Sequence, residues 1–289
     1  MTLRPRRTLL YMPGANARAL EKARSLNADG FIFDLEDAVA PDAKETARAQ
    51  ICDAVRQGGY RGREIVIRVN GLDTPWGVDD VKAAAAVTPD AILLPKVESK
   101  DQIQDLAALI EDYGDLASTA IWAMMETPRG ILRSPEIAAF HPRLTCFVMG
   151  TSDLVKDLHA AHTPLRLPVL VSLGQCLLAA RAEGLAILDG VYLDINDETG
   201  FHESCLQGKE LGFDGKTLIH PKQIDAANSV FAPSSDDIDH AARLIAAYDE
   251  AMSQGKAVAL LDGKLVENLH VEEARRLVSL AKTIETLNS

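Results

Sequence analysis

Charged side chains follow directly after short apolar runs at several points along this chain of 289 residues. Glu126 closes the run TAIWAMME (119–126), and Asp153 follows the run TCFVMG (145–150). Two isolated carboxylates with a cation nearby suit a hard divalent ion such as Mg²⁺, which proteins commonly hold with one or two carboxylates while water and substrate oxygens complete the octahedron. On spacing alone, the two acids fit equally well as structural groups in salt bridges.

Arg68 and Lys96 are the cations that end two other apolar runs, EIVIRVN and AILLPKV. A guanidinium can bind a carboxylate through two parallel hydrogen bonds, so Arg68 could clamp an anionic substrate. It could equally be the salt-bridge partner of Asp34 or Glu36, which end the run GFIFDLE. Both interpretations stay open here, because a charged side chain beside an apolar strand must be paired or bind something.

The remaining run ends carry further polar or turn-forming residues. They are Tyr11, Pro13 and Gly14 after the first run, Asp37 and Asn70 after the second and third, Asp189 and Tyr192 after the seventh, and His220 and Pro221 after the eighth. The chain contains no GxSxG, HExxH or GxxxxGK[ST] motif, so no serine nucleophile elbow, zinc-protease helix or phosphate-binding loop is indicated. The chemistry is therefore expected to depend on a metal and carboxylates.

Eight such apolar runs alternate with amphipathic stretches over roughly 230 residues, which is the count of a TIM (β/α)8 barrel. Nearly continuous apolar character is typical of parallel strands that are covered on both faces. A doubly wound open sheet has the same local pattern, but YMPGAN after the first run is no GxGxxG turn, and polar residues end nearly every run. We therefore predict a barrel whose polar run ends meet at one mouth. The predicted strands lie in 8–12, 30–36, 64–70, 91–97, 119–126, 145–150, 186–192 and 215–221.

The pattern changes after Pro233. Ser234 and the acidic residues that follow it are typical of a helix N-terminus, and an amphipathic stretch continues to about residue 253. A short segment and a final helix to residue 287 come next, with no strand that could join the barrel. We therefore predict a TIM-barrel catalytic domain over 1–232 and a C-terminal helical extension over 233–289, which packs on the barrel or on another subunit.

Composition argues against several classes of protein. The 42 acidic and 30 basic side chains give a formal net charge of −12, which argues against a nucleic-acid partner because such proteins need a basic face. No apolar run approaches the length that a membrane span needs, and the N-terminus has no pattern of a secretory signal. The four cysteines are far apart in the sequence, as expected for reduced thiols in a cytoplasmic protein.

The chain carries, in this order, the motifs RRTLLYMPG, FIFDLEDAV, VIRVNG, LLPKVES, METPRG, MGTSDL, FDGKTLIHPKQI and DGKLVENLH. Together they resemble the citrate lyase beta-subunit/malyl-CoA lyase family of the HpcH/HpaI aldolase superfamily, over essentially the whole chain. The resemblance implies a TIM barrel with a C-terminal helical extension and homo-oligomers that are typically trimers or hexamers. It also implies Mg²⁺-dependent chemistry, with Mn²⁺ able to replace Mg²⁺, on coenzyme A (CoA) thioesters of hydroxy-dicarboxylic acids.

The resemblance further implies roles for individual residues. Glu126 and Asp153 would be the Mg²⁺ ligands, and Arg68 would bind the carboxylate of the substrate. The residues expected at CoA are Tyr11, Arg18 and Lys22, for its phosphates and adenosine, and Ile219 and His220 at the end of the eighth strand. Independently, Arg18 and Lys22 lie four residues apart and share a helix face, which gives either a cationic patch for an anionic ligand or an ordinary solvated face.

Glu267, in the tail motif VENLH, departs from the family pattern. The lyases usually carry an aspartate there, which reaches the active site of a neighbouring subunit and acts as acid or base. Glutamate extends the carboxyl group by one methylene, and catalytic geometry can be sensitive to ~1 Å. The difference favours hydrolysis, and within the family the chain looks closest to the thioesterases that act on (3S)-malyl-CoA.

We therefore predict an enzyme that hydrolyses (3S)-malyl-CoA to malate and CoA, with Glu267 moving the proton. One alternative is a carbon–carbon lyase that cleaves malyl-CoA, methylmalyl-CoA, citramalyl-CoA or a citryl thioester to an acyl thioester and an oxo acid. Another is an acyl-carrier-dependent subunit that is inactive alone, whereas the tail argues against a pyruvate-using aldolase. The acyl group stays open, because a hydrophobic pocket separates substrates that differ by one methyl group by only ~1–3 kcal/mol.

Overall fold

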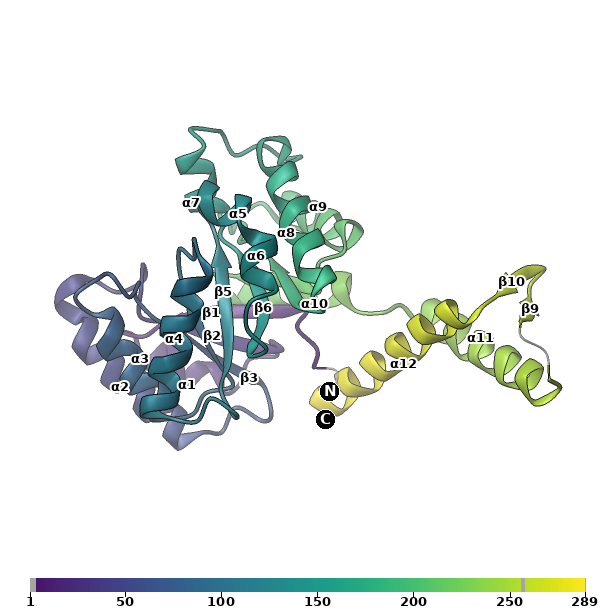
Figure 1. Ribbon diagram of the computed structural model, residues 1–289, viewed down its shortest axis with the longest axis horizontal. Helices are drawn as coiled ribbons and strands as arrows, with labels where there is room; N and C mark the ends of the chain where they lie inside the picture. Colours follow the sequence, from purple (N-terminus) through teal and green to yellow (C-terminus); the bar gives the residue numbers. More distant parts are fainter. Residues whose placement is uncertain (1–3, 256–257, 289) are drawn as a thin grey trace. The chain divides into compact units, whose positions relative to one another are not determined.

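The computed structural model describes residues 4–255 and 258–288. Within these residues the chain forms two compact units: Arg6–Phe231, and a second unit that combines residues 4–5 with the chain from Ala232 onward (Figure 1). Each unit has its own hydrophobic core, so each is described by itself.

The first unit is built on a closed barrel of eight parallel strands in sequential order, in which β1 pairs with both β2 and β8. The predicted TIM barrel is therefore confirmed, and an open doubly wound sheet is excluded because such a sheet has two free edges. The strands are β1 (Thr8–Pro13), β2 (Gly30–Asp34), β3 (Glu64–Arg68), β4 (Ala91–Leu94), β5 (Ala120–Met125), β6 (Leu144–Met149), β7 (Ala186–Asp189) and β8 (Gly215–Leu218).

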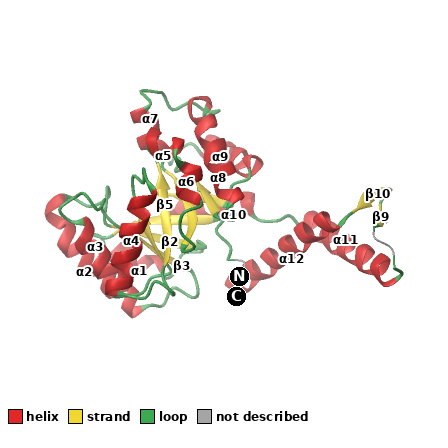
Figure 2. Ribbon diagram, viewed as in Figure 1, coloured by secondary structure: helices red, strands yellow, loops and turns green. Residues whose placement is uncertain are grey.

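Helices follow the strands and surround the barrel (Figure 2). Helix α4 illustrates why the amphipathic stretches fold in this way: Ser99 and Gln102 form a capping box at its start, and apolar residues three and four apart face the core. The helices are α1 (Ala17–Ala23), α2 (Lys44–Gln57), α3 (Gly77–Ala85), α4 (Lys100–Tyr113), α5 (Pro128–Leu132), α6 (Ser134–Ala138), α7 (Thr151–Asp157), α8 (Leu170–Ala182), α9 (Glu198–Leu211) and α10 (Ile224–Phe231).

The barrel unit has two layers of apolar packing. One layer consists of strand side chains alone, among them Ile32, Val66, Met124 and Leu188, and fills the interior of the barrel. The other layer joins the alternate strand side chains to apolar side chains of the surrounding helices. Because side chains alternate between the two faces of a strand, these strands must be apolar on both faces, which explains their continuous apolar runs.

The second unit contains two long helices and a hairpin. Ser234 and Asp237 form a capping box at the start of the first helix, as the sequence predicts. The antiparallel strand pair lies in the segment for which no regular structure is predicted, and it forms a sheet separate from the barrel. The elements are α11 (Ser235–Ser253), β9 (Ala259–Leu261), β10 (Lys264–Val266) and α12 (Asn268–Asn288).

Two further observations bear on the expectations from composition. Among the described residues, no helix combines the length and the apolar character that a membrane span needs. The four cysteines, Cys52, Cys146, Cys176 and Cys205, are all buried and free. The cysteines therefore behave as small apolar side chains of the core.

Candidate active site

Asp34, Arg68 and Glu126 lie at or directly after the carboxyl ends of β2, β3 and β5. Each stands two residues after a side chain that packs in the interior of the barrel. Because side chains alternate along a strand, all three point inward at the mouth of the barrel. This is the face on which barrel enzymes place their active sites.

Arg68 is almost completely buried and makes ion pairs with Asp34, Glu36 and, at 3.9 Å, the exposed Asp37. Its Nε and Nη2 atoms each lie 2.6 Å from an oxygen of Asp34, in a bidentate pair. Its Nη1 atom lies 2.8 Å from Oε2 of Glu36. Burial opposes the ionisation of Asp34, but the charge and hydrogen bonds of Arg68 hold the pKa of this carboxyl group below its usual value. The interpretation of Arg68 as the partner of Asp34 and Glu36 is therefore correct, and substrate binding would have to use its remaining donors.

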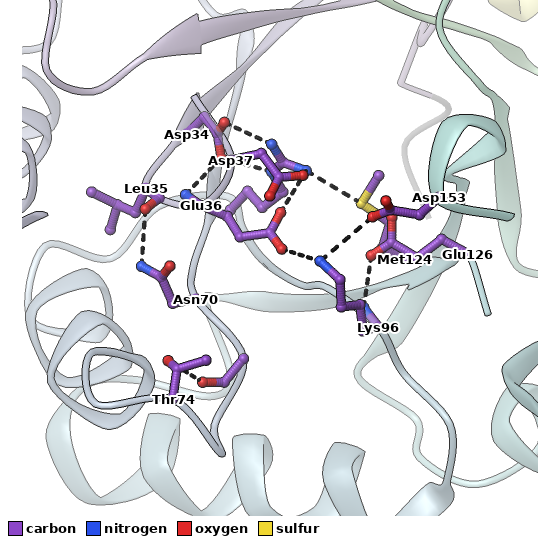
Figure 3. Close-up of polar contacts among 12 residues, drawn as sticks. Asp34, Leu35, Glu36, Asp37, Asn70, Thr74, Lys96, Met124, Glu126 and Asp153 are labelled. Atoms are coloured by element: carbon purple, nitrogen blue, oxygen red, sulfur yellow. Dashed lines mark hydrogen bonds and ion pairs between the residues drawn. The ribbon is translucent and has the colours of Figure 1, made fainter. Parts of the chain in front are cut away.

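Lys96 connects Glu36 with the two carboxylates that were predicted as metal ligands (Figure 3). Its ammonium pairs with Glu36 and lies 3.5 Å from Oδ2 of Asp153. Its backbone N–H donates to Oε1 of Glu126 at 2.8 Å. The residue has a φ of 50°, a left-handed conformation that is uncommon outside glycine and often marks a functional site. Burial opposes its charge, but Glu36 raises the pKa of Lys96 above its usual value, so the ammonium stays charged at neutral pH.

Glu126 is 2% exposed, and this burial raises its pKa to about 7, against the opposing influence of Lys96. Gly150, directly after β6, lies next to Glu126. A Cβ atom added at Gly150 would lie 2.3 Å from Oε2 of Glu126. Only glycine leaves room for the carboxylate there. This steric restriction explains why the motif MGTSDL has a glycine at position 150.

These six residues, Asp34, Glu36, Arg68, Lys96, Glu126 and Asp153, form what we call the mouth cluster. Four carboxyl groups face two cations, so the cluster carries a charge of −2 when all groups are ionised. Within the described residues, no three His, Cys, Asp or Glu side chains come together as in a metal site made by protein ligands alone. Two carboxylates and an excess negative charge nevertheless fit Mg²⁺, which keeps several positions for water and substrate.

A cavity of about 590 Å³ adjoins the mouth cluster. Glu36 and Lys96 form part of its wall, and Asn70, Trp76 and Gln102 contribute from the segments after β3 and β4. None of the residues predicted to bind metal, substrate or CoA lines this cavity. Glu36 and Lys96 belong both to the wall of the cavity and to the mouth cluster. In the sequence they stand out only as charged residues at strand ends, and this is the signal that could have identified them.

Tyr11 lies at the mouth, against Arg68. The guanidinium carbon of Arg68 is 4.8 Å from the centre of the tyrosine ring, and the Tyr11 hydroxyl is 3.9 Å from Sδ of Met124. Burial raises the pKa of this hydroxyl. Tyr11 is thus part of the wall around Arg68, and its expected role at CoA stays a prediction.

No hydrogen bond or ion pair among the described residues joins the other residues expected at CoA to the mouth cluster. Arg18 and Lys22 are exposed on α1, and no ion pair engages either of them within residues 4–255 and 258–288. Ile219 is 38% exposed after β8, and His220 begins a short 3₁₀ helix, where its Nδ1 accepts from the backbone N–H of Lys222 at 3.2 Å. The structure links these four side chains neither to Arg68 nor to Glu126 through any contact among the described residues.

Glu267 belongs to the second unit. It is exposed just before α12, and its backbone N–H donates to Nδ1 of His270 at 3.0 Å. The expected role of Glu267 in the active site of a neighbouring subunit stays a prediction.

Asp189 corrects the expectation that all charged strand ends meet at one mouth. It comes one residue after Leu188, which packs in the barrel interior, so its side chain points outward, toward α9. There its carboxylate pairs with Lys216 at 2.7 Å and with Arg166 at 2.6 Å. We call these three residues the β7–β8 cluster; Asp189 and Lys216 are completely buried, and Arg166 is partly buried.

Comparison with known proteins identifies the family. The family HpcH/HpaI aldolase/citrate lyase matches residues 7–221. The (3S)-malyl-CoA thioesterase of Cereibacter sphaeroides (strain KD131 / KCTC 12085) is 51% identical over 280 residues, which cover 97% of this chain and 96% of that protein. The citrate lyase subunit beta of Escherichia coli (strain K12) is 37% identical over 284 residues, which cover 96% of this chain and 94% of that protein.

Solved structures agree with this assignment. The structure of CitE from Mycobacterium tuberculosis in complex with magnesium, acetoacetate and coenzyme A has a TM-score of 0.77 and 28% identity, and the match covers 98% of this chain and 100% of that one. RipC from Yersinia pestis has a TM-score of 0.70 and 30% identity, with 82% and 100% covered. The resemblance seen in the eight motifs is thereby confirmed, and the chain belongs to the HpcH/HpaI aldolase/citrate lyase family.

Proposed function

We propose that this chain is a Mg²⁺-dependent enzyme that hydrolyses (3S)-malyl-CoA to malate and CoA. The observation that supports this most is the mouth cluster, in which the carboxylates of Glu126 and Asp153 both lie beside Lys96, and Glu36 joins Lys96 to the buried Arg68. The chain is also 51% identical to a (3S)-malyl-CoA thioesterase over nearly its whole length. The charge of the mouth cluster, its position in the barrel and the similarity to a thioesterase therefore all favour Mg²⁺-dependent hydrolysis of a CoA thioester.

Glu126 and Asp153 are the residues that would hold Mg²⁺. Both are adjacent to Lys96, and the excess negative charge of the mouth cluster favours a divalent cation there. Bound Mg²⁺ would supply Lewis-acid polarisation of the substrate oxygens and a template for their orientation. Mn²⁺ is expected to replace it, because both ions prefer oxygen ligands.

Arg68 would bind the free carboxylate of the malyl group. An arginine has five N–H donors, and the bidentate pair with Asp34 uses two of them. That pair also fixes the plane of the guanidinium, so the remaining donors have a defined direction. Tyr11, which packs against Arg68, limits the space around the bound carboxylate.

Hydrolysis needs a group that takes a proton from the attacking water as the C–O bond forms and gives one to sulfur as the C–S bond breaks. We assign this to Glu267 of a neighbouring copy in a homo-oligomer, a trimer or a hexamer. Its exposure in the second unit is compatible with service to another subunit. Arg18, Lys22, Ile219 and His220 would hold CoA; the two exposed cations on α1 suit its phosphates.

The reaction is tested by incubating the purified chain with malyl-CoA and Mg²⁺ while free thiol and glyoxylate are measured separately. Hydrolysis releases free thiol and no glyoxylate. Glyoxylate without matching thiol would replace the proposal with the lyase alternative, which the 37% identity to a citrate lyase subunit beta also supports. No reaction with free CoA thioesters would favour the acyl-carrier-dependent subunit.

Shared active sites are tested by mixing two inactive variants, Glu126→Gln and Glu267→Gln, after dissociation and reassembly. If Glu267 serves a neighbouring copy, mixed oligomers contain some sites with both native residues, and part of the activity returns. Mixtures that stay as inactive as the separate variants would contradict the assignment.

A further inference from the structure

Lys44, the first residue of α2, has a buried ammonium group that contacts three oxygen atoms. Its Nζ lies 2.7 Å from the carbonyl oxygen of Leu35, 2.7 Å from that of Glu36 and 2.8 Å from Oδ1 of Asn70. A lysine ammonium has three N–H donors, so each donor has one acceptor. The residue is 5% exposed, and its position is thus fully determined by these contacts.

Asn70 is itself held in place from behind. Its side-chain amide donates to the carbonyl oxygen of Leu35 at 2.9 Å and to Oδ2 of Asp80 at 2.5 Å. Asp80 is completely buried, and its other oxygen accepts from Nε of Arg48 at 2.7 Å. The acceptor that Asn70 offers to Lys44 therefore cannot rotate away without breaking two further hydrogen bonds. Leu35 and Asn70 are both seen in Figure 3, beside Glu36.

The two carbonyl groups that Lys44 binds belong to the segment that directly follows β2. On its other side this segment is held by Asp34, whose carboxylate accepts from the backbone N–H groups of Glu36 and Ala38. The Glu36 carboxylate that it carries lies between Arg68 and Lys96. A shift of this backbone would therefore move the group that orients both cations of the mouth cluster.

A neutral donor could satisfy two backbone carbonyl groups, and it would avoid the cost of a buried charge. The ammonium instead binds two consecutive carbonyl groups and a rigid side chain at the same time, which defines where the segment lies. We propose that Lys44 is a positioning residue of this active site: it holds the backbone of Leu35 and Glu36 so that the Glu36 carboxylate orients Arg68 and Lys96. In its kinetic consequences, the inference rests on the proposed function.

The test compares Lys44→Met with Lys216→Met. Both replace a buried lysine by an apolar side chain of similar length, but Lys216 belongs to the β7–β8 cluster and points away from the mouth. We expect Lys44→Met to lower kcat roughly 10²-fold, the cost of displacing catalytic groups by about 1 Å, with a smaller change in KM. Lys216→Met lowers the thermal stability and leaves kcat near the native value. An equal loss of kcat in both variants, or none in Lys44→Met, would overturn the inference.

A double-mutant cycle shows whether the effect of Lys44 passes through Glu36. If it does, adding Lys44→Met to Glu36→Gln lowers kcat little further, because the two changes remove the same interaction. Multiplied losses in the double variant would show that Lys44 acts elsewhere. Should Lys44→Met fail to fold, Asn70→Ser retains the ammonium and removes one of its acceptors, and an intermediate loss of kcat is expected; an unchanged kcat counts against the inference.

A crystal structure of Lys44→Met gives a readout that does not depend on the reaction. In Lys44→Met we expect the Glu36 carboxylate to leave its position between Arg68 and Lys96. In Lys216→Met we expect it to keep that position. An unchanged Glu36 in Lys44→Met would refute the positioning role. If the native enzyme does not hydrolyse malyl-CoA but Glu36 is displaced in Lys44→Met, the proposed function is refuted and the positioning role of Lys44 is not.

Discussion

The mouth cluster and the β7–β8 cluster each contain a buried carboxyl group at or directly after the carboxyl end of a barrel strand, Glu126 and Asp189, but they differ in charge and in surroundings. The mouth cluster has four carboxyl groups and two cations, and a cavity adjoins it. The β7–β8 cluster has one carboxylate and two cations, and its Asp189 carboxylate is completely buried against α9. When all groups are ionised, the mouth cluster has a net charge of −2 and the β7–β8 cluster a net charge of +1.

The pKa values of the central carboxyl groups reflect this difference. Burial raises the pKa of Glu126 to about 7, because the cations around it compensate the burial only in part. Burial acts in the same direction on Asp189, but Lys216 and Arg166 outweigh it and lower the pKa of this residue. Burial of ions alone therefore does not mark an active site, whereas a carboxylate whose burial is compensated only in part, in a cluster that adjoins a cavity, is a candidate for one.

The largest effect is expected for Glu126→Gln, which removes one of the two proposed Mg²⁺ ligands. The loss in kcat/KM should exceed the roughly 10- to 100-fold cost of changing a residue that only supports a ligand. Steady-state hydrolysis of malyl-CoA measures it, and Glu183→Gln, at an exposed acid beyond α8, is the matched control. Native activity in Glu126→Gln would contradict the assignment of the mouth cluster, and not the β7–β8 cluster, as the active site.

Asp189→Asn should act on stability instead. It leaves the buried Lys216 and the partly buried Arg166 without their carboxylate, and breaking a buried ion pair such as that of Lys216 costs about 3–5 kcal/mol. Urea unfolding measures the loss, while kcat per folded molecule stays at the native value. A loss of kcat with unchanged stability would place Asp189 in the active site.

The pH dependence of stability should distinguish the two clusters in the absence of divalent cations. Glu126 has a pKa of 4.5 when unfolded and about 7 when folded, so the folded state binds more protons between these values. Its contribution to stability is fully present below pH 4.5 and is lost as the pH rises through about 7. Unfolding measured from pH 4.5 to 8 in a chelator should show this decrease, and Glu126→Gln should reduce it. An unchanged slope in the variant would contradict the raised pKa.

The smallest effect is expected for the double change Arg18→Ala and Lys22→Ala, outside both clusters. Exposed ion pairs contribute ~0.2–1 kcal/mol each, so the loss of two should raise KM for the thioester by about twofold to about 30-fold, without loss of kcat. The increase should shrink at high salt, because salt screens exposed charges. The matched control is Arg56→Ala with Lys82→Ala on α2 and α3, and an equal KM in both double variants would remove the CoA assignment from α1.

Most of the fold and part of the site could be predicted from the sequence because the signals are local. Continuous apolar runs and helical periodicity gave the eight strands and their order, and charged run ends gave Arg68, Glu126 and Asp153 as candidates. The hairpin β9–β10 escaped prediction, because its strands are three residues long. Lys44 also escaped it, because a lysine at the start of a helix looks solvated until the tertiary structure buries it.

Glu126 and Asp189 show where the sequence alone could not decide. Both follow an apolar run, but Glu126 stands two residues after the inward Met124 and Asp189 one residue after the inward Leu188. A difference of one residue exchanges the inner face of a strand for the outer one. A strand that is apolar on both faces carries no local mark of which face is which.

The sequence by itself therefore determined the barrel, the family resemblance and a set of charged candidates at the strand ends. Only the tertiary structure decided which of them meet at the mouth, which are tied up as structural ion pairs, and which buried lysine holds the backbone beneath them. The physical reason is that these choices depend on strand register, barrel closure and contacts between residues far apart in the chain.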